Sequence, residues 1–437
     1  MLSILGFAMV AAFTVLIMTR RMTPLTALII TPILFGAVAL VLSGKGVVDL
    51  GPMMIEGVKT LAPTGVMLLF AILFFGLMTD TGLFDPAVAL LVRVVKGDPL
   101  KIILGTVVLG ALVSLDGDGS TTYIITCAAL MPLYQRLGLN RLYLVCLLML
   151  VSGVMNLSPW GGPTARAASA LHVEVQDVFL PLIPGMAIGL VALLGLAFLF
   201  GRAERRRLGV VSIEDAEEFA EVSVSQHPEA RRPKLILVNA ALVIALLAGL
   251  VAGVAPLPVM MMTAFAVGLV INYPRIETQK ERIAAHAGPA LAVASLIFAA
   301  GVFTGILQGT GMVEAMSRWV VAAIPEAWGP YMAPITAGLS LPFTFLLSND
   351  AFYFGVLPIL AEAGAQFGVD KVEIARASLM GQPFHLLSPL VPSTYLLVSL
   401  AGVDLADHQK FTAPFAIAVC LVMGAAAVAL GAFPFGA

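Results

Sequence analysis

The sequence predicts an all-α polytopic membrane protein. It is expected to contain two inverted repeats, each of five transmembrane helices plus one re-entrant hairpin, with broken helices at the midplane. Three observations predict this fold. Only 11 % of the 437 residues are charged, against about 25 % in soluble domains, and mean hydropathy is +1.01. Apolar runs recur along the whole chain, and polar motifs recur in its two halves.

The strongest apolar runs predict nine transmembrane spans, since each crossing needs roughly 20 residues. They lie at 2–19, 24–43, 64–79, 141–157, 177–201, 235–253, 256–273, 289–307 and 411–434. The first span is expected to be retained, because it lacks the basic start and the small-residue cleavage site of a signal peptide. A further apolar region, 371–401, is interrupted by prolines.

Two other apolar stretches, 100–133 and 331–361, have Gly, Asp, Ser or Asn at their centres. Each half of such a stretch is too short to cross a bilayer alone. Non-helical backbone at membrane depth is tolerated only where protein buries it or where it lines a cavity. We therefore expect both stretches to be re-entrant hairpins.

The distribution of basic residues predicts the orientation. With both hairpins re-entrant and the N-terminus outside, most Lys and Arg residues fall in inside loops, including the charged stretch 202–234. The outside loops hold only Lys45, Lys59, Arg318, Lys371 and Arg376. This asymmetry follows the positive-inside rule. It predicts an inner (plasma) membrane protein with both termini outside and a cytoplasmic linker at 202–234.

A shift of about 230 residues brings polar motifs of the two halves into register. "SPWGGPTARAAS" (158–169) falls on "SPLVPSTYLLVS" (388–399), and "DGS" (118–120) falls on "SND" (348–350). Since five spans is an odd number, the second half must be inverted, as in many secondary transporters. The predicted repeats are 1–201, with hairpin 100–133 and broken helix 141–172, and 235–437, with hairpin 331–361 and broken helix 371–402.

The candidate binding site combines the two hairpin tips with the two broken helices. Proline and glycine open a helix, and the freed N–H groups at a helix start favour carboxylates. A small polyanion, or its complex with a cation, fits such a site. The candidate ligand-binding residues are Gly119, Ser120, Thr121, Asn156, Ser158, Gly162, Thr164, Arg166, Ser348, Asn349, His385, Ser388, Ser393 and Thr394.

Charged groups inside the membrane are costly and usually functional. Arg166 is expected to bind a carboxylate through its guanidinium fork; the alternative is a structural ion pair. Asp116, Asp118, Asp350 and His385 are the candidates for metal or proton coupling. The alternative for the aspartates is capping of the hairpin tips, and the alternative for His385 is a hydrogen-bonded position in the core. The sequence does not indicate which of these residues binds the metal and which binds a proton.

Other classes of function lack support. We find no nucleophile–base pair or metal triad of an intramembrane enzyme, and so predict that the chain is not an enzyme and holds no permanent cofactor. A net charge of −2 gives no indication of nucleic-acid binding.

The motifs "SLDGDGSTTYIITCAALMPLYQRLGLNR", "NLSPWGGPTARAASAL", "LLSNDAFYFGVLPIL" and "GQPFHLLSPLVPSTYLLV" closely resemble the CitMHS family of bacterial metal–citrate:proton symporters, in the ion transporter superfamily. The resemblance covers nearly the whole chain apart from the charged linker. It implies a homodimer that moves by an elevator mechanism and imports citrate complexed with a divalent cation of the Mg²⁺ or Ca²⁺ type. The alternative is a cation/proton antiporter, or another organic or inorganic anion transporter of the same superfamily.

Overall fold

The computed structural model describes residues 1–95, 97–117, 119–210 and 228–436. Within these ranges the chain forms helices and turns and no β-strand. In this described part of the chain, six helices are long and apolar enough to cross a membrane, and five shorter apolar helices accompany them.

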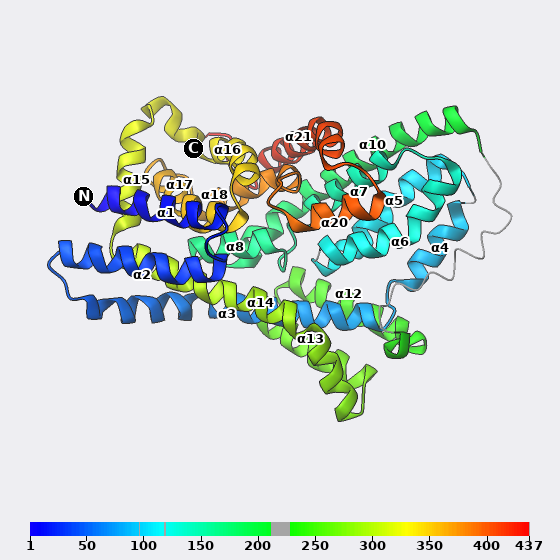
Figure 1. Cartoon of the computed structure of the whole chain (residues 1–437), viewed down its shortest axis with the longest axis horizontal. Helices are drawn as coiled ribbons and strands as arrows, with labels where there is room; N and C mark the ends of the chain where they lie inside the picture. The colour runs from blue at the N-terminus through cyan, green and yellow to red at the C-terminus, as the bar shows by residue number, and fades with distance from the viewer. Residues whose placement is uncertain (96, 118, 211–227, 437) are drawn as a thin grey trace.

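One layer of the molecule, which we call the lower layer, runs along the bottom of Figure 1. Its long helices α3 and α14 pack against each other along much of their length, while α2 packs on α14, α13 packs on α3, and α12 packs on α13. The lower layer consists of α2 (Pro24–Leu42), α3 (Leu50–Asp80), α12 (Ile236–Ala252), α13 (Leu257–Asn272) and α14 (Ile276–Gly309).

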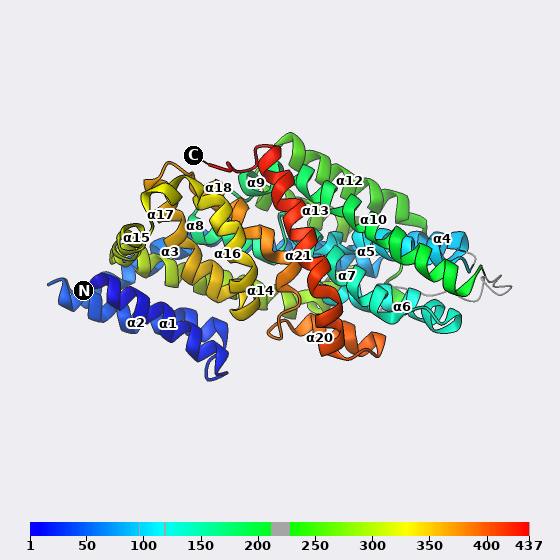
Figure 2. The ribbon, with the colours of Figure 1, turned by 90° about the horizontal axis from the view of Figure 1, so that it is seen from above.

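The upper layer holds the remaining helices. Helix α10 packs against α5 and α21, and Figure 2 shows α21 beside α10. At one end, α1 packs on α15, which in turn packs on α17. The upper layer consists of α1 (Leu2–Met18), α4 (Asp85–Val95), α5 (Pro99–Val113), α6 (Gly119–Leu137), α7 (Arg141–Met155), α8 (Gly162–Leu171), α9 (Val175–Phe179), α10 (Ile183–Leu208), α15 (Met312–Ala323), α16 (Met332–Leu346), α17 (Leu357–Gln366), α18 (Lys371–Ser378), α19 (Gln382–His385), α20 (Pro392–Ala401) and α21 (Leu405–Ala429).

Glycines bring the backbones of α3 and α14 into direct contact. A Cβ atom added at Gly57 would lie 2.0 Å from the carbonyl oxygen of Gly301, and one at Gly305 would lie 2.3 Å from that of Met53. Gly301 and Gly305 form the small-xxx-small spacing that lets membrane helices approach closely. This contact was not predicted from the sequence, although the "GVFTG" spacing signals it.

The two central helices are longer than the spans predicted from hydropathy. The predicted spans 64–79 and 289–307 begin at or just after Pro63 and Pro289, but α3 and α14 continue as helices through both prolines. Charged residues in their first halves lower the hydropathy there. Packing of α3 against α14 holds the helix on both sides of each proline.

Helix α10 also extends further than expected, through the first seven residues of the predicted linker to Leu208. Its last turn is basic, which suits the negative end of the helix dipole. Arg207 in this turn bonds to Glu204 and donates to the carbonyl oxygen of Gly138 at 2.7 Å. Beyond the undescribed segment, Arg232 lies over the Tyr273 ring, 4.4 Å from its centroid.

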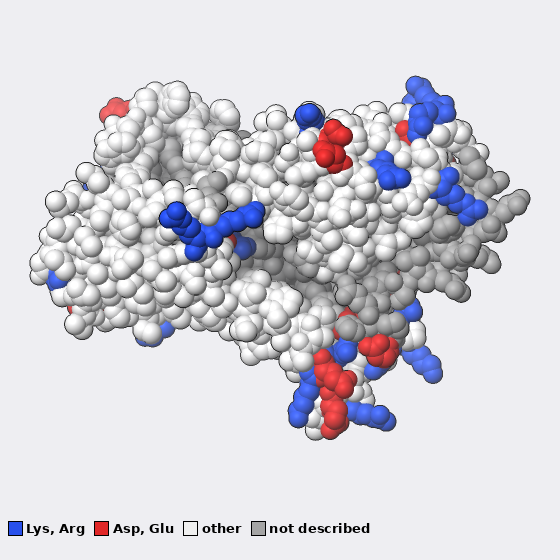
Figure 3. Space-filling model, viewed as in Figure 1, with Lys and Arg blue, Asp and Glu red and all other residues white. Residues whose placement is uncertain are grey.

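On the face in Figure 3, charged side chains cluster at the turn between α13 and α14 and in a few separate groups elsewhere, and most of the surface between these groups is uncharged. This distribution suits a protein surrounded by lipid. Both halves also contain helices of similar length in the same order. Helices α3 and α14 have 31 and 34 residues, α5 and α16 have 15 each, and α8 and α20 have 10 each.

Candidate functional site

Four irregular segments meet at the centre of the upper layer. Tip one (114–117) follows α5 and lies before α6, and tip two (347–350) follows α16 and precedes a π-helical segment, Ala351–Val356. Break one (156–161) separates α7 from α8, and break two (386–391) separates α19 from α20. Helices α8 and α20 begin at Gly162 and Pro392, 230 positions apart.

Break one is bonded to tip one. The indole nitrogen of Trp160 donates to the carbonyl oxygen of Leu115 at 2.9 Å. Gly117 has φ +76°, and an added Cβ there would lie 2.8 Å from the Trp160 ring. Two features therefore favour glycine at this position: the left-handed backbone, which side chains disfavour, and the Trp160 indole, which leaves no room for a Cβ atom.

Replacing Trp160 with phenylalanine is expected to loosen tip one, because it removes the indole N–H and leaves the Leu115 carbonyl without that donor. The expected cost is about 1–2 kcal/mol of stability. Thermal unfolding in detergent measures it, with Trp319→Phe as the control, since Trp319 is 62 % exposed on α15. Equal melting temperatures for the two variants would contradict the role of the Trp160 bond.

Break two is bonded to the end of α16 just before tip two. Ser388 Oγ donates to the carbonyl oxygen of Phe345 at 2.6 Å, and His385 Nδ1 lies 2.5 Å from that of Thr344. A carbonyl only accepts, so Nδ1 of His385 carries a proton. This bond accords with the core role considered for His385 and leaves its Nε2 for other partners.

Two threonines predicted to bind ligand close the helix breaks. Thr164 Oγ1 donates to the carbonyl oxygen of Leu157 at 2.9 Å, and Thr394 Oγ1 donates to that of Leu386 at 2.5 Å. Both threonines are fully buried. Their hydroxyl protons are thus used inside the protein, and the same holds for Ser388.

Each tip meets the broken helix of the opposite half. Helix α20 packs against α6, and α8 packs against the π-helical segment and α17. A Cβ atom added at Gly119, which begins α6, would lie 3.6 Å from Ser393 Oγ on α20. At tip two, Arg166 Nε of α8 donates to Asp350 Oδ1 at 2.6 Å. The site is therefore built from both halves of the chain.

The Arg166–Asp350 ion pair is largely buried, with 18 % of the Arg166 side chain and 11 % of the Asp350 side chain exposed. Gly162 lies one turn before Arg166, and a Cβ atom added there would lie 2.6 Å from Nη1. Glycine at 162 therefore makes room for the guanidinium. The ion pair considered as the alternative for Arg166 is present, and the remaining N–H groups of its fork are further donors.

A small cavity of about 70 Å³ lies at tip one. Two serines near it have buried Oγ atoms that bond to nothing among the described residues: Ser152, which lines the cavity, and Ser158 in break one. Hydroxyl and amide groups line the cavity together with apolar surface. The lining residues are Ser114, Gly117, Gly119, Thr122, Tyr123, Ser152, Asn156, Leu386 and Ser393.

Some predicted residues cannot be assigned a place. Asp118 lies outside the described residues, and so does the side chain of Asp116. Ser120 and Thr121 lie in the first turn of α6. Among the described residues, no group of three His, Cys, Asp or Glu side chains could hold a metal ion.

Tip two includes partners that were not predicted from the sequence. Gln382 Nε2 on α19 donates to Tyr353 Oη at 2.8 Å and lies 3.3 Å from Asn349 Oδ1. Gln382 is fully buried. Ser348 Oγ accepts from the backbone N–H of Ala351 at 3.2 Å. No sequence signal marks Gln382, because it reaches tip two only through the packing of α19.

A second ionic group lies in the lower layer. Asp80 Oδ2, at the end of α3, is 2.8 Å from His286 Nε2 and 3.2 Å from Arg282 Nη1, both on α14. This group fixes α3 to α14 at the end opposite to Gly305. It is separate from the two tips.

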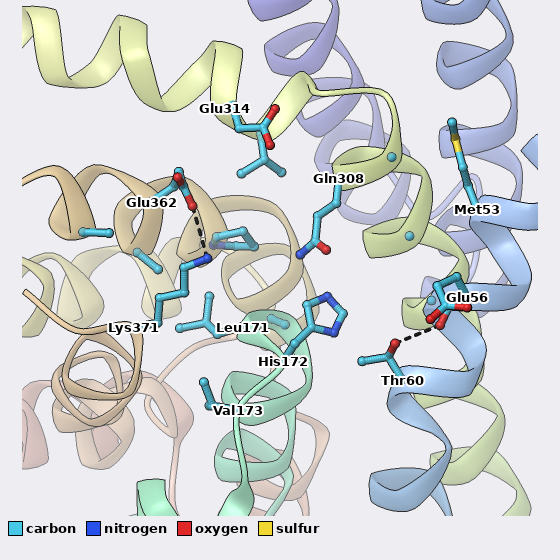
Figure 4. A pocket seen from close by; sticks show the side chains of 18 of the residues that line it. Met53, Glu56, Thr60, Leu171, His172, Val173, Gln308, Glu314, Glu362 and Lys371 are labelled. Atoms are coloured by element: carbon cyan, nitrogen blue, oxygen red, sulfur yellow. Dashed lines mark hydrogen bonds and ion pairs between the residues drawn. The ribbon is translucent and has the colours of Figure 1, made fainter.

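A larger cavity, the vestibule, has a volume of about 1320 Å³ and lies between the layers at the ends of α3, α8 and α14. Figure 4 shows His172 at the end of α8 close to Gln308 of α14. Lys371 Nζ is 3.2 Å from Glu362 Oε2. The vestibule is lined by five charged residues. Four of them are acidic, Glu56, Glu314, Glu362 and Asp370, and the fifth is Lys371.

Comparison with known proteins identifies the family. The CitMHS family model, described as citrate transporter, matches residues 8–381. A citrate transporter of Bacillus subtilis (strain 168) is 56 % identical over 438 residues, covering 100 % of both chains. The Mg(2+)/citrate complex secondary transporter of the same strain is 51 % identical over 432 residues, covering 99 % of both.

Two solved structures share the fold. The Alcanivorax borkumensis YdaH transporter has a TM-score of 0.63 at 16 % identity, over 90 % of both chains. Neisseria gonorrhoeae MtrF has a TM-score of 0.61 at 16 % identity, over 87 % of this chain and 84 % of its own. The predictions of an all-helical, multi-span membrane protein and of a transporter rather than an enzyme are confirmed. The chain belongs to the CitMHS family of citrate transporters.

Proposed function

We propose that this protein is a secondary transporter that imports citrate complexed with a divalent metal cation in symport with protons. The observation that carries the proposal is the identity of 56 % and 51 % to two full-length relatives named for citrate and for the Mg²⁺–citrate complex. The largely buried Arg166 supports it, because a guanidinium fork is suited to a carboxylate. The metal enters as part of the substrate.

The two layers support an elevator mechanism. The lower layer, joined through α3 and α14, serves as the scaffold, and α5–α10 with α16–α21 form the moving domain that carries both tips. The similar helix order in the two halves supports inverted repeats at 1–201 and 235–437, joined by a cytoplasmic linker. A homodimer and an outside location of both termini complete the proposal.

The test is uptake of radiolabelled citrate into proteoliposomes with Mg²⁺, with Ca²⁺ and with excess EDTA, with and without a pH gradient. We expect EDTA to abolish uptake and an acidic outside to accelerate it. Liposomes without protein are the control. EDTA-insensitive uptake would show transport of the free anion, and pH-independent uptake would exclude proton symport. Proton-coupled cation movement without citrate would support the antiporter alternative.

A further inference from the structure

Tip two holds a permanent positive charge beside an ionisable acid, within a domain that has to cross the membrane. Arg166 and Asp350 come from opposite halves of the chain and meet at 2.6 Å, largely shielded from solvent. An arginine stays protonated in proteins, whereas an aspartate can accept a proton. Asp350 is therefore the member of the pair whose charge can change.

We propose that Asp350 is the proton carrier of this transporter and that it exchanges with a substrate carboxylate as the counter-ion of Arg166. In the empty site the Asp350 carboxylate neutralises the guanidinium. In the loaded site a substrate carboxylate takes that place, and Asp350 binds one proton to become a neutral carboxylic acid. This assignment rests on the proposed function and names the residue that links one proton to citrate.

Charge balance explains why the exchange couples the movement of one proton to the movement of the substrate. The empty pair and the loaded, protonated site each contain Arg166 with one counter-charge, so their transfer through the membrane interior costs similar free energy. A proton without substrate leaves Arg166 unpaired, and a substrate without a proton places two anions beside one guanidinium. Both intermediates bury an uncompensated charge, which is strongly unfavourable. The domain thus moves readily only when empty or when carrying both.

The surroundings of tip two leave few competitors for this role. Helix α1 packs against the π-helical segment and carries no titratable side chain, and α14 carries none over 290–309. On α17, Glu362 pairs with Lys371. Tyr353 of the segment itself accepts from Gln382.

His385 is the remaining titratable group that faces the pair, from α19. Its Nδ1 bonds to the Thr344 carbonyl oxygen at 2.5 Å, and an imidazole, whether neutral or protonated, carries no negative charge that could neutralise Arg166. Among the described groups around tip two, Asp350 is the acid in contact with Arg166. The exchange therefore involves these two side chains.

The deciding experiment measures the pH dependence of Mg²⁺–citrate binding to purified wild-type protein and to Asp350→Asn. One linked proton weakens binding by about tenfold for each pH unit above the pKa of the acid. The amide of Asp350→Asn imitates the protonated acid. We expect this variant to lose one such linked proton, to retain exchange of labelled for unlabelled citrate, and to lose accumulation driven by a pH gradient.

Asp407→Asn, an acid-to-amide change at an exposed position on α21, is the matched control. The pH dependence that comes from citrate itself and from its chelation of Mg²⁺ is the same for both variants. A wild-type pH slope together with gradient-driven accumulation in Asp350→Asn would overturn the proposal. If wild-type protein failed to bind Mg²⁺–citrate at all, the proposed function would fail instead, so the two failures are distinguishable.

Infrared difference spectroscopy on wild-type protein supplies a readout that does not depend on the variant's folding. Binding of ¹³C-labelled citrate with Mg²⁺ is expected to produce the carbonyl band of a newly protonated carboxylic acid, separate from the shifted bands of citrate. The absence of that band at a pH where binding occurs would also overturn the proposal.

Discussion

Arg166→Ala is expected to abolish citrate uptake, because it removes the described cation that faces tip two. Truncating one member of a buried, hydrogen-bonded charge pair weakens binding by roughly 30-fold or more. Arg166→Lys keeps the charge but loses the two-pronged geometry, and should fall between alanine and wild type. Equilibrium binding of labelled citrate with Mg²⁺ measures all three proteins.

Loss of the guanidinium also leaves Asp350 buried without its counter-ion, at a cost of about 3–5 kcal/mol. The double variant Arg166→Ala/Asp350→Asn removes this unpaired charge. It should therefore recover much of the thermal stability while remaining unable to bind citrate. Wild-type affinity in a folded Arg166→Ala protein would exclude Arg166 from the substrate site.

Gly301→Leu is expected to destabilise the scaffold strongly. An added Cβ at 301 would lie 2.8 Å from the carbonyl oxygen of Gly57 and 2.9 Å from Cα of Val58, both backbone atoms that cannot rotate away. Overpacking typically costs 1–3 kcal/mol, and about 3 kcal/mol or more is expected where helix backbones collide. Unfolding temperature and monodispersity in detergent measure the effect.

Gly288→Leu is the matched control in the same helix, since an added Cβ there meets no atom within 4 Å. It should leave stability unchanged or raise it slightly, because leucine favours a helix more than glycine does. Comparable melting temperatures for the two leucine variants would contradict the close glycine contact between α3 and α14.

The irregular segments were predictable because local chemistry defines them. Closely spaced prolines and glycines in "SPWGGPT" and "SPLVPST" favour a helix break, and the structure has breaks at 156–161 and 386–391. The lengths of α3 and α14 were not predictable in this way. Hydropathy falls in their first halves, and tertiary packing, chiefly between the two helices, keeps them helical through Pro63 and Pro289.

The partners of individual side chains depend on tertiary packing. Arg166 and Asp350 were both candidates, but their contact joins residues 184 positions apart, and no local pattern reports such a pairing. The hydroxyl of Thr164 looked suited to a carboxylate, yet it donates to the Leu157 carbonyl across the helix break. The residue types indicated a polar centre. The fold was needed to show which of these polar side chains bond within the protein and which are left to contact a ligand.

The crossing of tips and broken helices has a consequence for how the protein is made. Arg166 leaves the ribosome 184 residues before Asp350, so α8 enters the membrane ahead of its counter-ion. A lone arginine at that depth is unfavourable, and contacts between distant parts of a chain form late. We therefore expect the first half to stay loosely packed around α8 until tip two is inserted and Asp350 can pair with Arg166. Formation of the binding site and completion of the fold are the same event.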